Sequence, residues 1–378
     1  MTTFDHSAPS RRSRWFAGVV LVAALMAGAA PVQATGTEGS SGAESSPAQI
    51  VVLGDSYSSG NGAGAYSDRP CMRSDLAYGP VAARQLGAEI TMAACGGGVL
   101  ADLSQPRHLR WETSRTRSYW LPRSSYPTVA DQAAEWQRRV EAEGLCGSAP
   151  EDRFYEYRRV APAPAGSIYT ATAACHLWAH PQIASVSDQT DHVFLTIGGN
   201  DGGFVDIVVQ CFVLREAIGC ERSLSVAEGR LGTIQDGLAA ALRDIDRASS
   251  GAATIHLVAY PMLINRDSYT LPEGPAGWYD AGAELNRIQQ DYTALQRETV
   301  ERLNAETGSE RFRLVDPTAT FEGRGLDPRI GASQHHSWIV PPFSSLDIPG
   351  FMHPTATGHA QQAPLLVTSV LESTTTAG

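Results

Sequence analysis

The sequence predicts an α/β protein built as a three-layer αβα sandwich, in which helices cover both faces of a mostly parallel sheet. Short apolar runs that are typical of buried strands alternate along the chain with longer segments whose apolar residues recur at helical spacing. Such alternation is typical of parallel sheets, in which a helix connects one strand to the next. The chain has 378 residues, of which 43% are hydrophobic, so it is long enough to bury a sizeable core.

The expected strands and helices follow one another from residue 49 onward. Short apolar runs predict strands at 49–56 (QIVVLGDS), 88–97 (AEITMAACGG), 192–201 (HVFLTIGGND), 253–261 (ATIHLVAYP) and 311–317 (RFRLVDP). Helical spacing predicts helices at 79–87, 226–248, 283–306 and 359–373. The strongest of these helices is 283–306, which has the sequence AELNRIQQDYTALQRETVERLNAE.

The alternation of strands and helices lapses at residues 104–190, which we interpret as a long, loop-rich insertion. This segment holds four of the seven tryptophans, Trp111, Trp120, Trp136 and Trp178, together with many arginines and tyrosines. Long insertions of this kind are often functional. Two interpretations remain open: a lid or substrate-binding wall over the edge of the sheet, and a disulfide-stapled loop layer with a small core of its own.

Residues 1–34 have the pattern of a secretory signal peptide. Arg11, Arg12 and Arg14 precede the apolar run WFAGVVLVAALMAGAA, which is too short for a comfortable membrane span, and VQA offers a cleavage site at Ala34. The arginines fit either a Sec or a twin-arginine signal. We therefore predict export, cleavage near Ala34 and no stable membrane anchor in the mature protein.

The composition of the rest of the chain indicates its domain organisation and the kinds of partner that it can bind. Residues 35–48 are rich in Gly, Ser and Glu, which predicts a flexible linker before one folded domain over 49–378. The formal charge is −11, and it becomes −13 when residues 1–34 are removed, because that segment carries three arginines and one aspartate. An acidic protein is poorly suited to binding phosphate backbones, so nucleic acid is excluded as a partner.

The six cysteines all lie in the exported part of the chain, where an even number predicts disulfides. Six cysteines allow fifteen pairings, and the positions are Cys71, Cys95, Cys146, Cys175, Cys211 and Cys220. No C-x-x-C is present, and neither the i, i+4 pair His176 and His180 nor the adjacent His335 and His336 is completed by a carboxylate into a zinc motif. We therefore expect no metal and no cofactor.

Candidate site residues follow three of the predicted strands. Ser56, Gly97 and Asn200 each lie just past a strand end, and ligands of open α/β sheets bind beyond the carboxyl ends of the strands. GDSYS lacks the second glycine of the G-x-S-x-G elbow. A chymotrypsin-like arrangement needs a histidine upstream of the serine, and the only one is His6, inside the predicted signal.

Four sequence blocks together resemble the SGNH, or GDSL-type, hydrolase family, and most closely its secreted actinobacterial lipases and phospholipases. The blocks are GDSYSSG (54–60), AACGGG (93–98), TIGGND (196–201) and FMHPTATGH (351–359), in the family order. The resemblance implies a flavodoxin-like sheet and a secreted serine ester hydrolase that acts on fatty-acyl esters and needs no cofactor. A carbohydrate deacetylase-type esterase and a non-catalytic secreted binding protein on the same fold stay open as alternatives.

Carried over to this sequence, the resemblance implies that Ser56 is the nucleophile and His353 its general base. It also implies an oxyanion hole that consists of the backbone N–H groups of Ser56 and Gly97 and the side-chain amide of Asn200. A serine hydroxyl needs a neighbouring base to become a strong nucleophile, and donors that are already in place stabilise the tetrahedral oxyanion.

Several of these assignments have alternatives. Gly96 or Gly98 can serve as the donor in place of Gly97, and Asn200 can be only a turn residue. Asp55 and Asp201 are expected to accept hydrogen bonds within their loops rather than to act as catalytic acids.

The sequence departs from the family at the residue that orients the base. Many SGNH hydrolases carry an acidic residue three positions before the histidine, where this chain has Gly350. We expect a main-chain oxygen just before His353 to accept from its Nδ1 instead, because the base needs its tautomer fixed. Asp347 is the rival for this role.

The resemblance also implies which cysteines pair. Related secreted members join them sequentially, which gives Cys71 with Cys95, Cys146 with Cys175, and Cys211 with Cys220. Cys95 lies two residues before Gly97, so its disulfide would steady the oxyanion loop.

Overall fold

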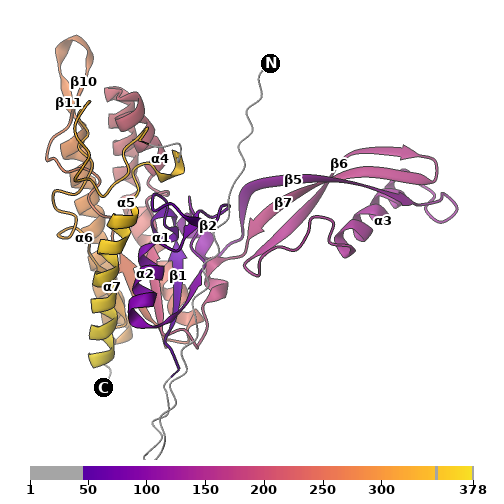
Figure 1. Cartoon of the computed structure of the whole chain (residues 1–378), viewed down its shortest axis with the longest axis horizontal. Helices are drawn as coiled ribbons and strands as arrows, with labels where there is room; N and C mark the ends of the chain where they lie inside the picture. The colour runs from indigo at the N-terminus through magenta and orange to yellow at the C-terminus, as the bar shows by residue number, and fades with distance from the viewer. Residues whose placement is uncertain (1–45, 345–347, 377–378) are drawn as a thin grey trace, which may run out of the picture. The chain divides into compact units, whose positions relative to one another are not determined.

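A five-stranded parallel sheet forms the centre of the protein, as seen in a computed structural model that describes residues 46–344 and 348–376 (Figure 1). The strands lie in the order β4-β1-β8-β9-β12. Their bounds are Gln49–Gly54 (β1), Glu89–Met92 (β4), His192–Thr196 (β8), Thr254–Val258 (β9) and Phe312–Val315 (β12). Counted along the chain this order is 2-1-3-4-5, the flavodoxin-like order, and all four pairings are parallel. The predicted fold class is confirmed.

Helices cover both faces of this sheet because successive strand residues point to opposite sides. On one face Val51 and Leu53 pack with Leu238, Leu242 and other residues of α5 and α6. On the other face Ile50 and Val52 pack with residues of α2 and α7. The helices are α2 (Tyr78–Leu86), α5 (Ala217–Ala248), α6 (Ala281–Thr307) and α7 (Ala356–Thr376).

Helix α5 begins well before the predicted start at residue 226. Its first turn is capped by Glu216, whose carboxylate accepts from the N–H groups of Ile218 and Gly219. Cys220 lies in the same turn and is bonded to Cys211. A side-chain cap satisfies N–H groups that have no partner inside the helix, so these contacts start the helix where the apolar pattern is weak.

The insertion at 104–190 is more regular than the loop-rich segment expected from the sequence. A three-stranded antiparallel sheet in the order β5-β7-β6 is accompanied by helix α3. We call this part the arm, and its elements are β5 (Arg107–Trp120), α3 (Val129–Ala142), β6 (Arg153–Ala165) and β7 (Ile168–Ala179). The arm has its own small core around the fully buried Trp136, whereas Trp120 is 66% exposed.

The remaining elements are short. They are α1 (Ser56–Ser59), β2 (Tyr66–Asp68), β3 (Arg73–Ser74), α4 (Phe204–Ile207), a π-helical segment at Val208–Leu214, β10 (Thr270–Pro272) and β11 (Trp278–Asp280), together with 3₁₀ turns at Leu100–Leu103, Gln182–Ser185, Gly274–Ala276 and Ile348–Gly350. The predicted signal peptide at 1–34 and most of the predicted linker at 35–48 lie outside the described residues, as does Asp347. Within the described ranges, no helix is both long and apolar enough to cross a membrane.

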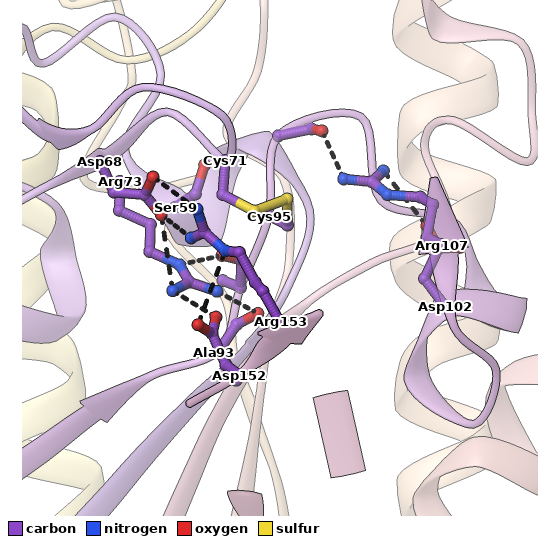
Figure 2. Close-up of a disulfide and its surroundings, with 12 residues drawn as sticks. Ser59, Asp68, Cys71, Arg73, Ala93, Cys95, Asp102, Arg107, Asp152 and Arg153 are labelled. Carbon is purple, nitrogen blue, oxygen red and sulfur yellow. Dashed lines mark hydrogen bonds and ion pairs between the residues drawn. A yellow bond between two sulfur atoms is a disulfide. The ribbon is translucent and has the colours of Figure 1, made fainter. Parts of the chain in front are cut away.

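Three disulfides join the cysteines in the sequential pairing that the family resemblance implied, Cys71–Cys95, Cys146–Cys175 and Cys211–Cys220. The first connects the segment after β2 to the loop after β4 (Figure 2). The second lies in the arm. The third joins Cys211, in the segment before α5, to Cys220 in the first turn of α5.

Candidate active site

Ser56 lies where β1 turns into the short helix α1, at the carboxyl edge of the sheet. Gly54 makes this turn possible, because its φ is +114° and a Cβ there would be 2.2 Å from the Thr196 carbonyl oxygen. The side chain of Asp55 then caps α1 by accepting from the N–H of Tyr57 at 2.9 Å. The serine is thereby held at the point where the sheet order reverses, between β1 and β8.

The structure brings Ser56 against His353, which lies almost 300 residues later in the chain. The Ser56 Oγ is 2.7 Å from the His353 Nε2, and both side chains are buried. The Phe351 carbonyl oxygen is 2.8 Å from the other ring nitrogen, Nδ1. With Nδ1 donating to that carbonyl, Nε2 is the acceptor for the serine proton. The expected main-chain acceptor just before His353 is therefore present, in Phe351.

The loop that carries His353 is tied to the serine helix. The Tyr57 hydroxyl donates to the Met352 carbonyl oxygen at 2.6 Å, and the Tyr57 ring lies 4.8 Å from the His353 ring between centroids. Met352 itself has a φ of 61°, in the left-handed region that non-glycine residues seldom adopt. The Met352 N–H donates to the Val340 carbonyl oxygen at 2.9 Å, and the Val340 N–H donates to the His353 carbonyl oxygen at 2.8 Å. His353 is thus positioned by Tyr57, the residue that follows Ser56.

Two backbone N–H groups at the site point to no acceptor within the described part of the chain, those of Ser56 and Gly97. The neighbouring candidates are occupied, since Gly96 donates to the Cys71 carbonyl at 2.8 Å and Gly98 donates to the Cys95 carbonyl at 3.0 Å. Of the three glycines, Gly97 therefore has the N–H that is available to a ligand. This geometry favours Gly97 over the two alternatives.

Asn200 lies beside the same loop. Its Nδ2 donates to the Gly98 carbonyl oxygen at 2.8 Å, which orients the side-chain amide and leaves its second hydrogen available. Asn200 and Gly97 both line the pocket that Ser56 and His353 enter. The residues predicted to form an oxyanion hole are therefore brought together.

Asp55 and Asp201 act as hydrogen-bond acceptors within this framework. Asp55 accepts from the Tyr260 hydroxyl as well as from Tyr57, and burial raises the pKa of its carboxyl to about 7. Asp201 accepts from the N–H of Leu100 at 3.1 Å, and burial raises the pKa of this carboxyl too. Both were expected to be loop-stabilising acceptors, and their contacts are of that kind.

The pocket at Ser56 holds about 400 Å³ and is strongly apolar. One wall is formed by α4 and the π-helical segment after it, and the other by the loop before His353. The apolar lining residues are Met72, Phe204, Val205, Val208, Val209, Val213, Ile348, Pro349 and Phe351. Among the described residues, none of those lining this pocket belongs to 104–190.

The other histidines singled out in the sequence lie elsewhere. His176 faces His108 on the neighbouring strand, with 3.3 Å between ring nitrogens, whereas His180 packs against Phe154. His335 and His336 are exposed. In the ranges that the structure describes, no group of three or more His, Cys, Asp or Glu side chains is arranged to hold a metal ion.

Sequence reasoning missed several residues of the site. Tyr57 and Tyr260 support Asp55 and the His353 loop, and Phe204 packs edge-on against the His353 ring at 5.5 Å. Tyr260 lies two residues past the end of β9, so the rule that singled out Ser56 and Asn200, a polar residue just past a strand end, would also have found it.

Fold and site together define an α/β protein with a buried serine and histidine pair, two N–H donors that meet no acceptor among the described residues, and an apolar pocket at the carboxyl edge of a parallel sheet. Neither a protein-family model nor a curated protein sequence matches the chain. Two solved structures from Streptomyces do resemble it.

The extracellular lipase of Streptomyces rimosus is 24% identical, and the match covers 85% of this chain and 99% of that one with a TM-score of 0.52. The phospholipase A1 of Streptomyces albidoflavus NA297 is 19% identical, with the same coverages and a TM-score of 0.53. The chain therefore has the fold of the SGNH hydrolases, as its sequence blocks predicted.

Proposed function

We propose that the protein is a secreted serine ester hydrolase that cleaves fatty-acyl esters through an acyl-enzyme, with Ser56 as nucleophile and His353 as general base. The observation that carries this proposal is the 2.7 Å contact between the Ser56 Oγ and the His353 Nε2 at an apolar pocket. A serine within hydrogen-bond distance of a base whose other nitrogen is already oriented is the arrangement needed for nucleophilic catalysis.

In the first half of the reaction, the Ser56 Oγ attacks the ester carbonyl carbon while its proton passes to the His353 Nε2. The carbonyl oxygen becomes an oxyanion, which accepts from the N–H groups of Ser56 and Gly97 and from the Asn200 amide. The C–O bond to the alcohol then breaks, and His353 returns the proton to the leaving oxygen. Water repeats these steps on the acyl-enzyme and releases the acid.

The shape and lining of the pocket support a fatty-acyl substrate. Its volume of about 400 Å³ is far larger than an acetyl group needs, and its apolar lining would bury an alkyl chain. Each buried CH₂ group contributes about 0.8 kcal/mol of transfer free energy. The names of the two similar structures, a lipase and a phospholipase A1, agree with this substrate class.

The three disulfides support secretion, because such bonds persist in oxidising compartments and are rare in the cytosol. We place the mature protein outside the cell, after removal of residues 1–34.

A chain-length profile tests the substrate class. We expect kcat/KM for p-nitrophenyl esters to rise from acetyl to medium or long acyl chains, because the pocket gains buried apolar contact with each added CH₂ group. A preference for acetyl alone would favour a carbohydrate deacetylase-type esterase. Failure of an alkyl fluorophosphonate to label the folded, disulfide-bonded protein would favour the non-catalytic binding protein.

The role of Asp347 is tested by Asp347→Asn. Because the Phe351 carbonyl already lies 2.8 Å from the His353 Nδ1, we expect kcat to fall less than about tenfold. Loss of a triad aspartate in the serine-protease template costs ~10⁴ in kcat. A thousandfold loss, with an unchanged melting temperature, would therefore make Asp347 the third catalytic residue.

A further inference from the structure

The loop that carries Gly97 consists of three consecutive glycines, Gly96 to Gly98, and its conformation is not fixed by side chains of its own. Gly97 has a φ of +76°, and glycine enters such conformations without steric cost. In such a loop a peptide unit can rotate so that its carbonyl, instead of its N–H, faces the pocket. Something outside the loop must therefore select the orientation in which Gly97 donates to an oxyanion.

Most contacts to this loop hold its ends. The Gly96 N–H donates to Cys71, the Gly98 N–H donates to Cys95, and Asn200 donates to the Gly98 carbonyl. The unit that matters for donation is the peptide between Gly96 and Gly97, because it contains the Gly97 N–H. Its other polar atom is the Gly96 carbonyl oxygen.

The side chain of Arg107 donates a hydrogen bond to that carbonyl oxygen. Its Nη2 donates to the Gly96 carbonyl at 2.9 Å, and its Nη1 would lie 3.7 Å from a Cβ at Gly97. A trans peptide is planar, with its C=O and N–H pointing in opposite directions. Fixing the Gly96 carbonyl on Arg107 therefore directs the Gly97 N–H away from the arginine, on the side where Gly97 lines the pocket with Ser56.

The guanidinium is itself held in place by Asp102, in the short 3₁₀ turn at Leu100–Leu103 that follows the glycine loop. Asp102 lies 3.2 Å from the Arg107 Nη1, and its carboxylate also accepts from the N–H of Val99 at 2.9 Å. Figure 2 shows Arg107 and Asp102 on one side of the Cys71–Cys95 disulfide, and Arg73 with Asp68, Asp152 and Arg153 on the other. Arg73 donates to the Ala93 and Ala94 carbonyls. Arg73 thus holds the residues just before the glycine loop, and Arg107 holds the loop itself.

We propose that Arg107 is a positioning residue of the oxyanion hole: by holding the Gly96 carbonyl it keeps the Gly97 N–H turned toward the oxyanion. The positive charge of the guanidinium next to the Gly96 carbonyl also polarises the peptide unit and strengthens the Gly97 N–H as a donor. Arg107 is the first residue of β5, so the arm contributes to the site through this contact, although no residue of the arm is among the described residues that line the pocket. This inference rests on the proposed function.

The test compares two variants with a matched control on the same strand. Arg107→Gln removes the cation, and Arg107→Gln/Asp102→Asn also removes the partner charge, so that no buried carboxylate is left unpaired. Arg115→Gln makes the same change at an exposed position of β5 and serves as the control. Melting temperatures and the kcat and KM for one medium-chain ester are measured for each.

We expect kcat to fall about tenfold to a hundredfold in both Arg107 variants, less than the loss of a donor outright, with KM within about twofold of the wild type. The control should behave as the wild type. An alkyl trifluoromethyl ketone gives a second readout, because its carbonyl carbon bonds to the Ser56 Oγ and its oxygen becomes the oxyanion. Its inhibition constant should rise by the factor by which kcat/KM falls.

An unchanged kcat in the double variant would overturn the role of Arg107 and leave the proposed function intact. So would a loss of kcat that appears only with a lowered melting temperature and leaves ketone inhibition unchanged, since that pattern belongs to a structural ion pair. Absence of any Ser56-dependent turnover in the wild type would instead overturn the proposed function, and this inference with it.

Discussion

Replacing Ser56 by alanine should lower the kcat for ester hydrolysis by roughly 10⁶, the loss known for removal of the nucleophile in a serine protease. In the proposed mechanism the Oγ that faces the His353 Nε2 bonds to the acyl carbon, and alanine has nothing in its place. The fold should persist, because the change removes one hydrogen bond, worth about 1 kcal/mol in net stability. Turnover and labelling by a fluorophosphonate are the measurements.

The same helix offers a matched control. Ser59 is a buried serine three residues further on, and its hydroxyl bonds the Ser56 carbonyl oxygen and the Asn61 Oδ1. Ser59→Ala should therefore keep labelling and most of the turnover. Labelling of Ser56→Ala at the wild-type rate would show that another residue reacts, and the proposed mechanism would be wrong.

The central sheet could be predicted because its strands are buried on both faces. Strands such as β1 and β8 are short, nearly continuous apolar runs, and each ends in a turn of glycine and a polar residue. Both properties are local in the sequence. The same locality made Ser56, Gly97 and Asn200 identifiable, since each follows such a run.

The strands of the arm could not be found in this way. Strands β5 and β7 place polar residues opposite one another, with hydroxyl contacts between Thr116 and Thr172 at 2.9 Å and between Ser118 and Thr170 at 2.8 Å. A strand stabilised by such cross-strand pairs has no apolar run to mark it. Its existence depends on a partner strand some 50 residues away, which a single sequence does not specify.

The supporting residues of the site were missed for a related reason. Arg107 acts on a backbone carbonyl, and Tyr57 donates to another, the Met352 carbonyl. A pattern of residue types identifies side chains that do chemistry, but it carries no sign of which carbonyl oxygen a distant arginine or tyrosine will meet. The orientation of His353 by the Phe351 carbonyl was predictable only because the usual acidic position is occupied by Gly350.

The expected effect of Asn200→Ala is a loss of about 10²–10³ in kcat, because one donor of the proposed oxyanion hole is removed. Alanine also frees the Gly98 carbonyl, which the Asn200 Nδ2 holds at 2.8 Å. Ground-state binding should change little, since the donors act mainly on the charge that develops in the transition state. KM and the melting temperature should therefore stay close to the wild type.

Asn200→Asp sharpens this test, because aspartate has nearly the same shape but carries negative charge where the amide donates. It should lower kcat at least as far as alanine does, which a merely steric role of Asn200 would not explain. Arg107 and Asn200 are proposed to serve the same oxyanion, so Arg107→Gln combined with Asn200→Ala should lose less than the product of the single losses. Normal kcat in Asn200→Ala would mean that the oxyanion is stabilised elsewhere, whereas strict additivity in the double variant would place Arg107 outside the hole while leaving Asn200 within it.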